Sequence, residues 1–309
     1  MTASEKSAKP AKAGSASSET KQQGARLSVF KTYKLYVGGK FPRSESGRVY
    51  EVTDSKAGRW LANAPLSSRK DARDAVVAAR KAVGGWSGAT AYNRGQVLYR
   101  VAEMLEGRSE QFAREVAEAE GLSKARAAAA VEAAVDRWVW YAGWTDKIAQ
   151  VVGGANPVAG PFFNLSTPEP MGVVAVLAPQ DSSFLGLVSV LAPVIATGNT
   201  AVVVASERAP LPALSLGEVL ATSDVPGGVV NVLSGKTAEI AGPLAAHQDV
   251  NGIDLTGAPA GLAAELETAA AENLKRVRRP SAEDWTADPG TGRLTAWLET
   301  KTVWHPIGV

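Results

Sequence analysis

The sequence predicts an α/β fold in which a parallel sheet carries helices on both faces and is joined to a small β arm. Short, mainly apolar runs alternate with longer helix-like segments in the second half of the chain, as in βα repeats. These runs are residues 172–177, 200–204, 229–233 and 253–255. Strands that are apolar along nearly their whole length are typical of parallel sheets covered on both faces. Residues 150–170 lack helical periodicity and are rich in Gly, Pro and Asn, which predicts an extended arm or hairpin.

The N-terminal segment is predicted to be a disordered tail. Residues 1–27 are rich in Ala, Ser and Lys, and they hold too little apolar surface to order themselves. The tail has no apolar core of the kind found in a secretory signal. Residues 34–37 follow as a short predicted strand, closed by the Gly38-Gly39 turn.

Four helices are predicted between residues 68 and 147. Ala72, Val76, Ala79 and Val83 recur at helical spacing and form one apolar stripe. The next helices are expected from about residue 91 to 105, at 111–119 and at 123–147. The last of them carries four large aromatic residues, which indicate core or interface packing. These are Trp138, Trp140, Tyr141 and Trp144.

One charge-free stretch, residues 182–206, is long enough to mimic a membrane span. Pro193 and the segment 197–200 interrupt it, so we interpret it as a buried helix at 184–196, a tight turn and a strand. The remaining helices are predicted at residues 211–223, 238–246 and 258–273. We therefore expect a soluble, cytoplasmic protein with no membrane partner.

The C-terminal part is predicted to be a linker followed by a strand. Residues 276–292 contain Pro280, Pro289, Gly290 and Gly292, as linkers do. The basic residues at the start of this segment are expected to be a solvated helix end, because cations favour the last turn of a helix. They are Lys275, Arg276, Arg278 and Arg279. Strand-like segments are predicted at 294–297 and 302–304, and an apolar terminal strand needs a pairing partner.

The composition excludes several classes of chemistry. The chain has no cysteine, which rules out disulfides, thiolate metal sites and a cysteine nucleophile. It has two histidines, His247 and His305, so we expect no metal site and a packed or surface role for His305. The net charge of +2 does not favour a nucleic-acid partner. Gly235-Lys236-Thr237 resembles the end of a P-loop, but Val230 stands where its first glycine is needed.

Parallel sheets bind ligands beyond the carboxyl ends of their strands. The loops after Leu177, Val204, Leu233 and Leu255 are therefore the expected ligand site. Asp181 follows one of these strand ends. Its place suits a site residue, and it suits a helix N-cap equally well.

Ordered sequence landmarks give the chain a resemblance to the aldehyde dehydrogenase superfamily. Thr167-Pro168-Glu169-Pro170-Met171-Gly172-Val173-Val174 is similar to that family's signature before its first cofactor-domain strand. Residues 192–199, 226–232 and 256–257 match later landmarks in order, and residues 36–40, 141–144 and 297–306 also fit. The resemblance covers residues 30–275 and about the last fifteen. It implies an aldehyde dehydrogenase-like, Rossmann-type parallel sheet with flanking helices and a small β oligomerisation arm.

The chain departs from the resemblance at the reactive positions. No cysteine can play the family's nucleophile. Asp181 stands where an asparagine would polarise the oxyanion, and a carboxylate there repels negative charge. Arg278-Arg279-Pro280-Ser281 replaces the segment of the general-base glutamate. We therefore expect a truncated member without the catalytic domain, similar to the degenerate second unit of double-domain aldehyde dehydrogenases, and we assign no catalytic residue.

The resemblance also implies a weakened cofactor site. Val204, Ala258 and Thr237 replace a ribose-binding lysine, a pyrophosphate-binding serine and a loop glycine. Each lost donor weakens binding by about 0.5–1.5 kcal/mol. The retained cofactor-binding candidates are Pro179, Ser206, Glu207, Gly235 and Gly257. We expect NAD or NADP to bind weakly at most.

The resemblance divides the chain into functional parts. Residues 28–149 and 171–275 form a degenerate dinucleotide-binding-like domain, and residues 150–170 with 293–309 form the oligomerisation arm and terminal strand. In the family this arm extends the catalytic-domain sheet of a neighbouring subunit, which a second copy of this chain would lack. The expected partner is therefore a full-length aldehyde dehydrogenase, although a homo-oligomer is possible.

Three functions stay open at this point. The first is a catalytically inactive structural or regulatory subunit of a complete NAD(P)-dependent aldehyde dehydrogenase. The second is a regulator that binds NAD(P) weakly through Glu207. The third is a residual oxidoreductase that acts on aldehydes through Ser182 or Ser183, for which the sequence offers no histidine base in an identifiable constellation.

Overall fold

The computed structural model describes residues 1 and 29–308. The chain divides into the units Met1–Lys31 and Thr32–Val309, and every helix and strand named below lies in the second. The predicted disordered tail, residues 1–27, falls outside the described residues except for Met1, and it stays a prediction.

A five-stranded parallel sheet forms the centre of this unit, in the order β7-β6-β5-β8-β9. Its strands are β5 (Val173–Leu177), β6 (Thr200–Val204), β7 (Val230–Leu233), β8 (Gly252–Asp254) and β9 (Arg276–Arg278). Every residue of β5 to β8 is buried, as their mainly apolar sequences predict for a sheet covered on both faces. The α/β fold class is confirmed.

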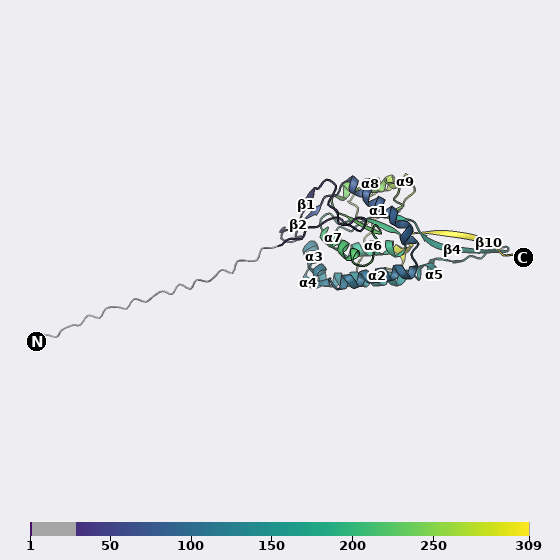
Figure 1. Ribbon diagram of the computed structural model, residues 1–309, viewed down its shortest axis with the longest axis horizontal. Coiled ribbons are helices and arrows are strands. Elements are labelled where there is room, and N and C mark those ends of the chain that lie inside the picture. The colour runs from purple at the N-terminus through teal and green to yellow at the C-terminus, as the bar shows by residue number, and fades with distance from the viewer. Residues whose placement is uncertain (2–28, 309) are drawn as a thin grey trace. The chain divides into compact units, whose positions relative to one another are not determined.

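Helices cover both faces of the sheet (Figure 1). One face packs against α1 (Arg69–Ser87), α8 (Thr237–Ala245) and α9 (Ala263–Ala271). The other packs against α6 (Leu185–Ala196) and α7 (Leu211–Ala221), with α2 (Ala91–Glu106), α3 (Ser109–Glu120) and α4 (Lys124–Trp144) outside them. Trp138 and Tyr141 of α4 are fully buried, so the aromatic segment is part of the core.

The charge-free stretch is a helix, a turn and a strand, as predicted. Every residue of α6 is buried between the sheet and α4, which explains why it carries no charge. Asn199 in the following turn holds three segments together. Its Oδ1 accepts from the amide of Gly172 at 2.8 Å, and its Nδ2 donates to the carbonyl of Trp297 at 2.8 Å and to Oγ1 of Thr197 at 2.9 Å.

The N-terminal strands differ from the prediction. A hairpin of β1 (Val49–Thr53) and β2 (Trp60–Pro65) was not predicted. Its residues alternate between buried and exposed only in part, so the period-two signal is weak. Residues 34–37 form no strand of their own and contribute isolated bridges, one of them between Tyr36 and Val232 at the edge of β7.

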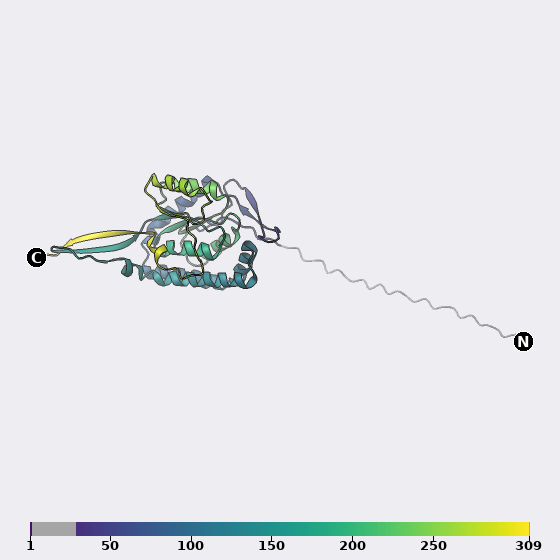
Figure 2. The same ribbon diagram turned by 180° about the vertical axis from the view of Figure 1, so that it is seen from behind.

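The arm is a separate three-stranded sheet in the order β10-β4-β3, and it extends away from the helices and the central sheet (Figures 1 and 2). Strand β4 (Phe162–Pro170) pairs along its whole length with β10 (Leu298–Pro306), while β3 (Gly154–Ala155) adds two residues. The short helix α5 (Ile148–Val152) leads into it. The predicted strands are thus confirmed, and the role of the arm in assembly stays a prediction.

Two C-terminal predictions were wrong. Residues 276–278 were assigned to the linker and to a solvated helix end, whereas they form β9 and pair with β8. Residues 294–297 were predicted to be a strand, but the first two belong to α10 (Gly292–Thr295) and the last two form a turn. Ion pairs with Glu299, Glu283 and Glu267 hold Arg276, Arg278 and Arg279, respectively. Tertiary contacts therefore override the local linker signal.

Candidate functional site

The expected site lies at the carboxyl end of the central sheet. The strand order reverses between β5 and β8, because β6 and β7 lie on one side of β5 while β8 and β9 lie on the other. Ligands of open α/β sheets bind in the crevice at such a switch point. A pocket of about 650 Å³ opens at this end of the sheet, lined in part by Gln180 and Asp181 after β5 and by Glu207 and Arg208 after β6.

Gln180 is the central residue of this crevice, and the sequence analysis missed it. Its Oε1 accepts from the amide of Glu207 at 2.9 Å, and its Nε2 donates to the carbonyl of Ala178 at 3.0 Å. A longer bond of 3.4 Å reaches the carbonyl of Gly257. Gln180 thus links the ends of β5, β6 and β8. The sequence feature that could have indicated Gln180 is its position shortly after the apolar run that forms β5, directly after Pro179.

Four of the five cofactor-binding candidates are buried, and Glu207 alone is partly exposed. These four are Pro179, Ser206, Gly235 and Gly257. The structure brings Ser206, Glu207 and Gly257 together around Gln180. The amide of Gly257 donates to the carbonyl of Leu177 at 2.9 Å, and a Cβ at Gly257 would lie 1.8 Å from the carbonyl oxygen of Ala178. Close backbone packing therefore accounts for this glycine without a ligand.

Glu207 already has partners within the protein. Its Oε2 accepts from the amide of Thr237 at 3.1 Å, two residues after Gly235, at the start of α8. The Tyr50 hydroxyl donates to the Glu207 carbonyl at 3.3 Å. Burial, together with the Glu207 charge, raises the pKa of Tyr50. A carboxylate thus occupies the α8 N-terminus, where a phosphate group would otherwise be favoured.

These contacts do not fit NAD or NADP, which carry a negatively charged pyrophosphate. Among the described residues that line the pocket there are five carboxylates and one guanidinium, that of Arg208. The carboxylates belong to Glu51, Asp54, Glu120, Asp181 and Glu207. Like charges disfavour an anionic ligand, and the amides of Gly257, after β8, and Thr237, at the start of α8, are already bonded within the protein. No step can be derived through a dinucleotide here.

The two hydroxyls in the loop after Asp181 are hydrogen-bonded within the protein, and of the two only Ser182 is partly exposed. Ser183 is only 1% exposed, and its Oγ donates to Oε1 of Glu120 at 2.8 Å. The Ser183 amide donates to the same oxygen at 2.7 Å. Ser182 Oγ accepts from the Gly186 amide at 2.9 Å, so Ser182 performs the capping role considered for Asp181. Both hydroxyls therefore fix the start of α6, and Asp181 is exposed.

A buried ion network closes the carboxyl end of β8. Arg293 Nη1 lies 2.7 Å from Asp254 Oδ2, and Arg293 Nη2 lies 2.5 Å from Glu283 Oε1. Glu283 also pairs with Arg278 at 3.2 Å. Burial opposes ionisation of Glu283, but hydrogen bonds and charge from Arg293, with Ser281 and Arg278, hold the pKa of Glu283 below its usual value. Sequence reasoning missed this network, because its members lie far apart along the chain.

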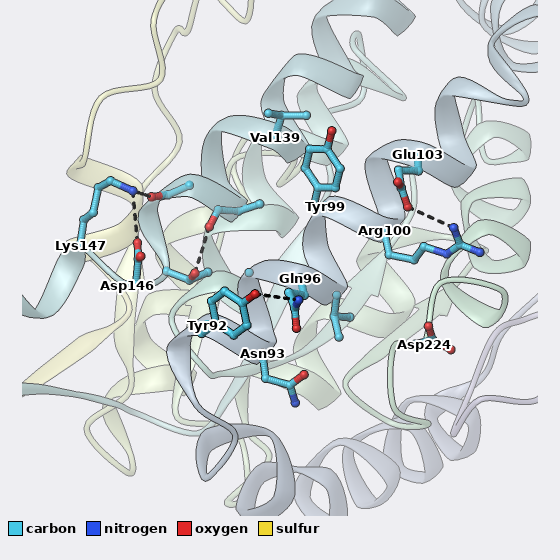
Figure 3. Close-up of a pocket in the computed structure, with 15 residues that line it drawn as sticks. Tyr92, Asn93, Gln96, Tyr99, Arg100, Glu103, Val139, Asp146, Lys147 and Asp224 are labelled. Carbon is cyan, nitrogen blue, oxygen red and sulfur yellow. Dashed lines mark hydrogen bonds and ion pairs between the residues drawn. The ribbon is translucent and has the colours of Figure 1, made fainter.

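A separate groove of about 680 Å³ lies between α2 and α4 (Figure 3). Four of its five charged residues pair with their neighbours, Arg100 with Glu103 at 3.1 Å and Lys147 with Asp146 at 3.2 Å, and the fifth is Asp224. The groove lies away from the strand ends and contains none of the predicted site residues.

Two absences hold for residues 1 and 29–308, the part of the chain that the structure describes. Within this part, no three His, Cys, Asp or Glu side chains are placed to hold a metal ion. None of the helices in the same part has the length and apolar character that a membrane crossing requires.

The fold and the crevice define a Rossmann-type α/β protein with an additional β arm. Comparison with known proteins gives the family. The aldehyde dehydrogenase family model matches residues 41–279, and the chain belongs to this family. It is 32% identical over 270 residues to the putative aldehyde dehydrogenase DhaS of Bacillus subtilis, a match that covers 84% of this chain and 53% of that protein. It is 31% identical to an aldehyde dehydrogenase of Aspergillus niger, with 79% and 48% covered.

Solved structures agree with this assignment. An aldehyde dehydrogenase from Bacillus cereus in complex with NAD⁺ superposes with a TM-score of 0.75 at 26% identity, over 80% of this chain and 50% of that one. A putative aldehyde dehydrogenase from Burkholderia cenocepacia gives 0.75 at 29% identity, over 79% and 51%. This chain therefore spans about half the length of these relatives.

Proposed function

We propose that this protein is a non-catalytic subunit that binds a full-length aldehyde dehydrogenase through its β arm. The observation that carries the proposal is the combination of a complete, exposed arm with a crevice that lacks reactive groups. The partner would supply the nucleophile and the cofactor site, and this chain would stabilise or regulate it.

The arm has the features of a pairing surface. Strand β10 is an edge of its sheet and is nine residues long. Such an edge offers its backbone amides and carbonyls to another strand. Large apolar side chains cluster near its far end, where Phe162 and Trp304 pack edge to face with ring centroids 5.8 Å apart. Phe163 is 50% exposed and Trp304 57% exposed. Exposed apolar groups on this scale favour burial against a partner.

The crevice supports the non-catalytic part of the proposal. The chain holds no cysteine, and the hydroxyls of Ser182 and Ser183 are engaged at the start of α6. Asp181 brings a carboxylate to the position where the family resemblance places an oxyanion donor, and a negative charge there would destabilise a developing oxyanion. The pocket is lined by five carboxylates and one guanidinium, which disfavours the weak NAD(P)-binding alternative.

The test compares two variants of the tagged chain, expressed in cells of its source. The double variant F163E/W304E places charges on the arm, and V77E places one on an equally exposed site of α1, where Val77 is 56% exposed. We expect the wild-type chain and V77E to co-purify with a full-length aldehyde dehydrogenase and the double variant to lose it. A wild-type chain that purifies alone, or only with copies of itself, would contradict the proposal.

A further inference from the structure

The segment between β9 and β10 lies outside the part of the chain that matches the family model, because that match ends at residue 279. We call its residues 281–297, which include α10, the strap. The strap contributes Glu283, Trp285 and Arg293 to contacts with three other elements of the fold. Its sequence contains Pro289, two glycines and four charged residues, yet it is not a free linker.

The strap is fastened to the central sheet by buried charges. The Arg293 and Asp254 side chains are 6% and 0% exposed, and their closest N–O distance is 2.7 Å. Arg293 Nη2 also donates to Oγ1 of Thr256 at 3.2 Å. Glu283 joins Arg293 to Arg278 of β9. The ends of β8 and β9 are therefore both tied to the strap.

The strap is also fastened to α4. Arg137 Nη2 donates to the carbonyl of Trp285 at 2.6 Å and to that of Ala287 at 3.1 Å. The guanidinium of Arg293 lies over the Trp285 ring, 5.4 Å from its centroid, within the range of a cation–π contact. Tyr141 of α4 is fully buried beside this network.

We infer that the strap is an intrachain cover over the carboxyl ends of β8 and β9. These strand ends form one half of the switch-point crevice, and β5 with β6 forms the other half. The open pocket is then confined to the β5 and β6 side, where Gln180 and Glu207 lie. Neither a ligand that spans the whole crevice nor a second domain from another subunit can occupy the β8 side while the strap is in place. A partner must therefore bind elsewhere, and the exposed arm is free to receive it.

The absence of cysteine allows a direct test, because one introduced thiol is the only thiol of the chain. Leu294, at the start of α10, is 0% exposed, as is Ala270 on α9 away from the strap. L294C reports opening of the strap region, and A270C reports opening elsewhere. Each is combined with E283Q, which removes the charge that joins Arg293 to Arg278.

We expect E283Q to speed labelling of L294C by a thiol reagent about tenfold or more, since charged hydrogen bonds are lost. Labelling of A270C should change less than about twofold, because the opening is local. Equal acceleration at both sites, or none at L294C, overturns the inference. The strap belongs to the isolated chain, so this result is independent of whether the proposed partner binds.

A second measurement needs no substitution. The amides of Ala296 and Trp297 donate to the carbonyls of Gly292 and Leu294 at 3.1 and 3.3 Å. In the unmodified chain we expect these amides to exchange with deuterium at least about tenfold more slowly than in an unfolded peptide. Unprotected exchange there, with a protected central sheet, would show that the strap is open and would overturn the inference.

Discussion

Arg293 and Asp254 form a buried ion pair with a closest N–O distance of 2.7 Å, although 39 residues separate them in the sequence. Asp254 ends a strand of the central sheet and Arg293 lies in α10, just before the arm strand β10. The pair therefore fixes the C-terminal part of the chain to the sheet. Glu283 completes the network from the other side of the guanidinium.

Removal of one member of this pair should be strongly destabilising. In R293M, Asp254 keeps a buried charge without its main partner, and such a change costs about 3–5 kcal/mol. Urea denaturation measures the loss. The matched control is D254N/R293M, which removes both charges and should recover much of the stability. A loss in R293M below about 1 kcal/mol, the value of an exposed pair, would contradict the buried network.

The lowered pKa of Glu283 predicts a loss of protein stability in acid. Burial raises its pKa, but hydrogen bonds and charge from Arg293 outweigh this and hold the pKa below the ordinary 4.5. The folded state therefore binds the proton less readily than the unfolded chain. The contribution of Glu283 is fully present above about pH 4.5 and is lost as the pH falls through the folded pKa. The stability difference between wild type and E283Q should shrink between pH 6 and pH 3 (about the range of carboxylate titration); a constant difference would disprove this role.

The raised pKa of Glu120 predicts the opposite pH dependence of stability. Burial, helped by the nearby charge of Asp181, raises its pKa above the ordinary 4.5, although Ser183 donates two hydrogen bonds to it. The folded state therefore binds the proton more readily than the unfolded chain. Its favourable contribution is complete below about pH 4.5 and is lost as the pH rises through the raised pKa. Thermal unfolding of E120Q should lack this dependence, and identical profiles for E120Q and wild type would refute the assignment.

The crevice predicts weak or no nucleotide binding. Its carboxylates oppose the pyrophosphate, and the Gly257 and Thr237 amides are bonded within the protein. Calorimetric titration of the isolated chain with NAD and with NADP should give no saturable heat, and thermal shift should show no stabilisation, at millimolar nucleotide. D181N serves as a comparison, because it removes one exposed carboxylate from the pocket rim. Saturation of the wild type below millimolar concentration would restore the nucleotide-binding alternative.

Much of the fold could be predicted because its signals are local. The mainly apolar runs of β5 to β8 are best buried in a sheet covered on both faces, and the turn at 197–199 separates α6 from β6. Pro193 lies inside α6 and does not end it. Residues 276–278 could not be recognised as a strand, since Arg276 and Arg278 depend on Glu299 and Glu283, which lie elsewhere in the sequence. The Asp254–Arg293 pair could not be predicted either, because 39 residues separate its members in the sequence.

The candidate site could be located but not described from the sequence. The rule for parallel sheets predicts a ligand site at these strand ends, and a pocket lined in part by Glu207 opens there. That this pocket binds a ligand stays a prediction. Gln180 was missed because an amide side chain gives no chemical signal until its three backbone neighbours are placed around it. The burial of Ser183, which removes it from consideration as a nucleophile, likewise depends on Glu120 from another helix.

The most direct test of the central claim is the native mass of the complex that the tagged chain forms in its own cells, with each component chain identified by peptide sequencing. The account predicts an assembly that contains this 309-residue chain and a longer aldehyde dehydrogenase with a cysteine nucleophile, lost in F163E/W304E and kept in V77E. A mass that corresponds to this chain alone, as a monomer or a homo-oligomer, would contradict it.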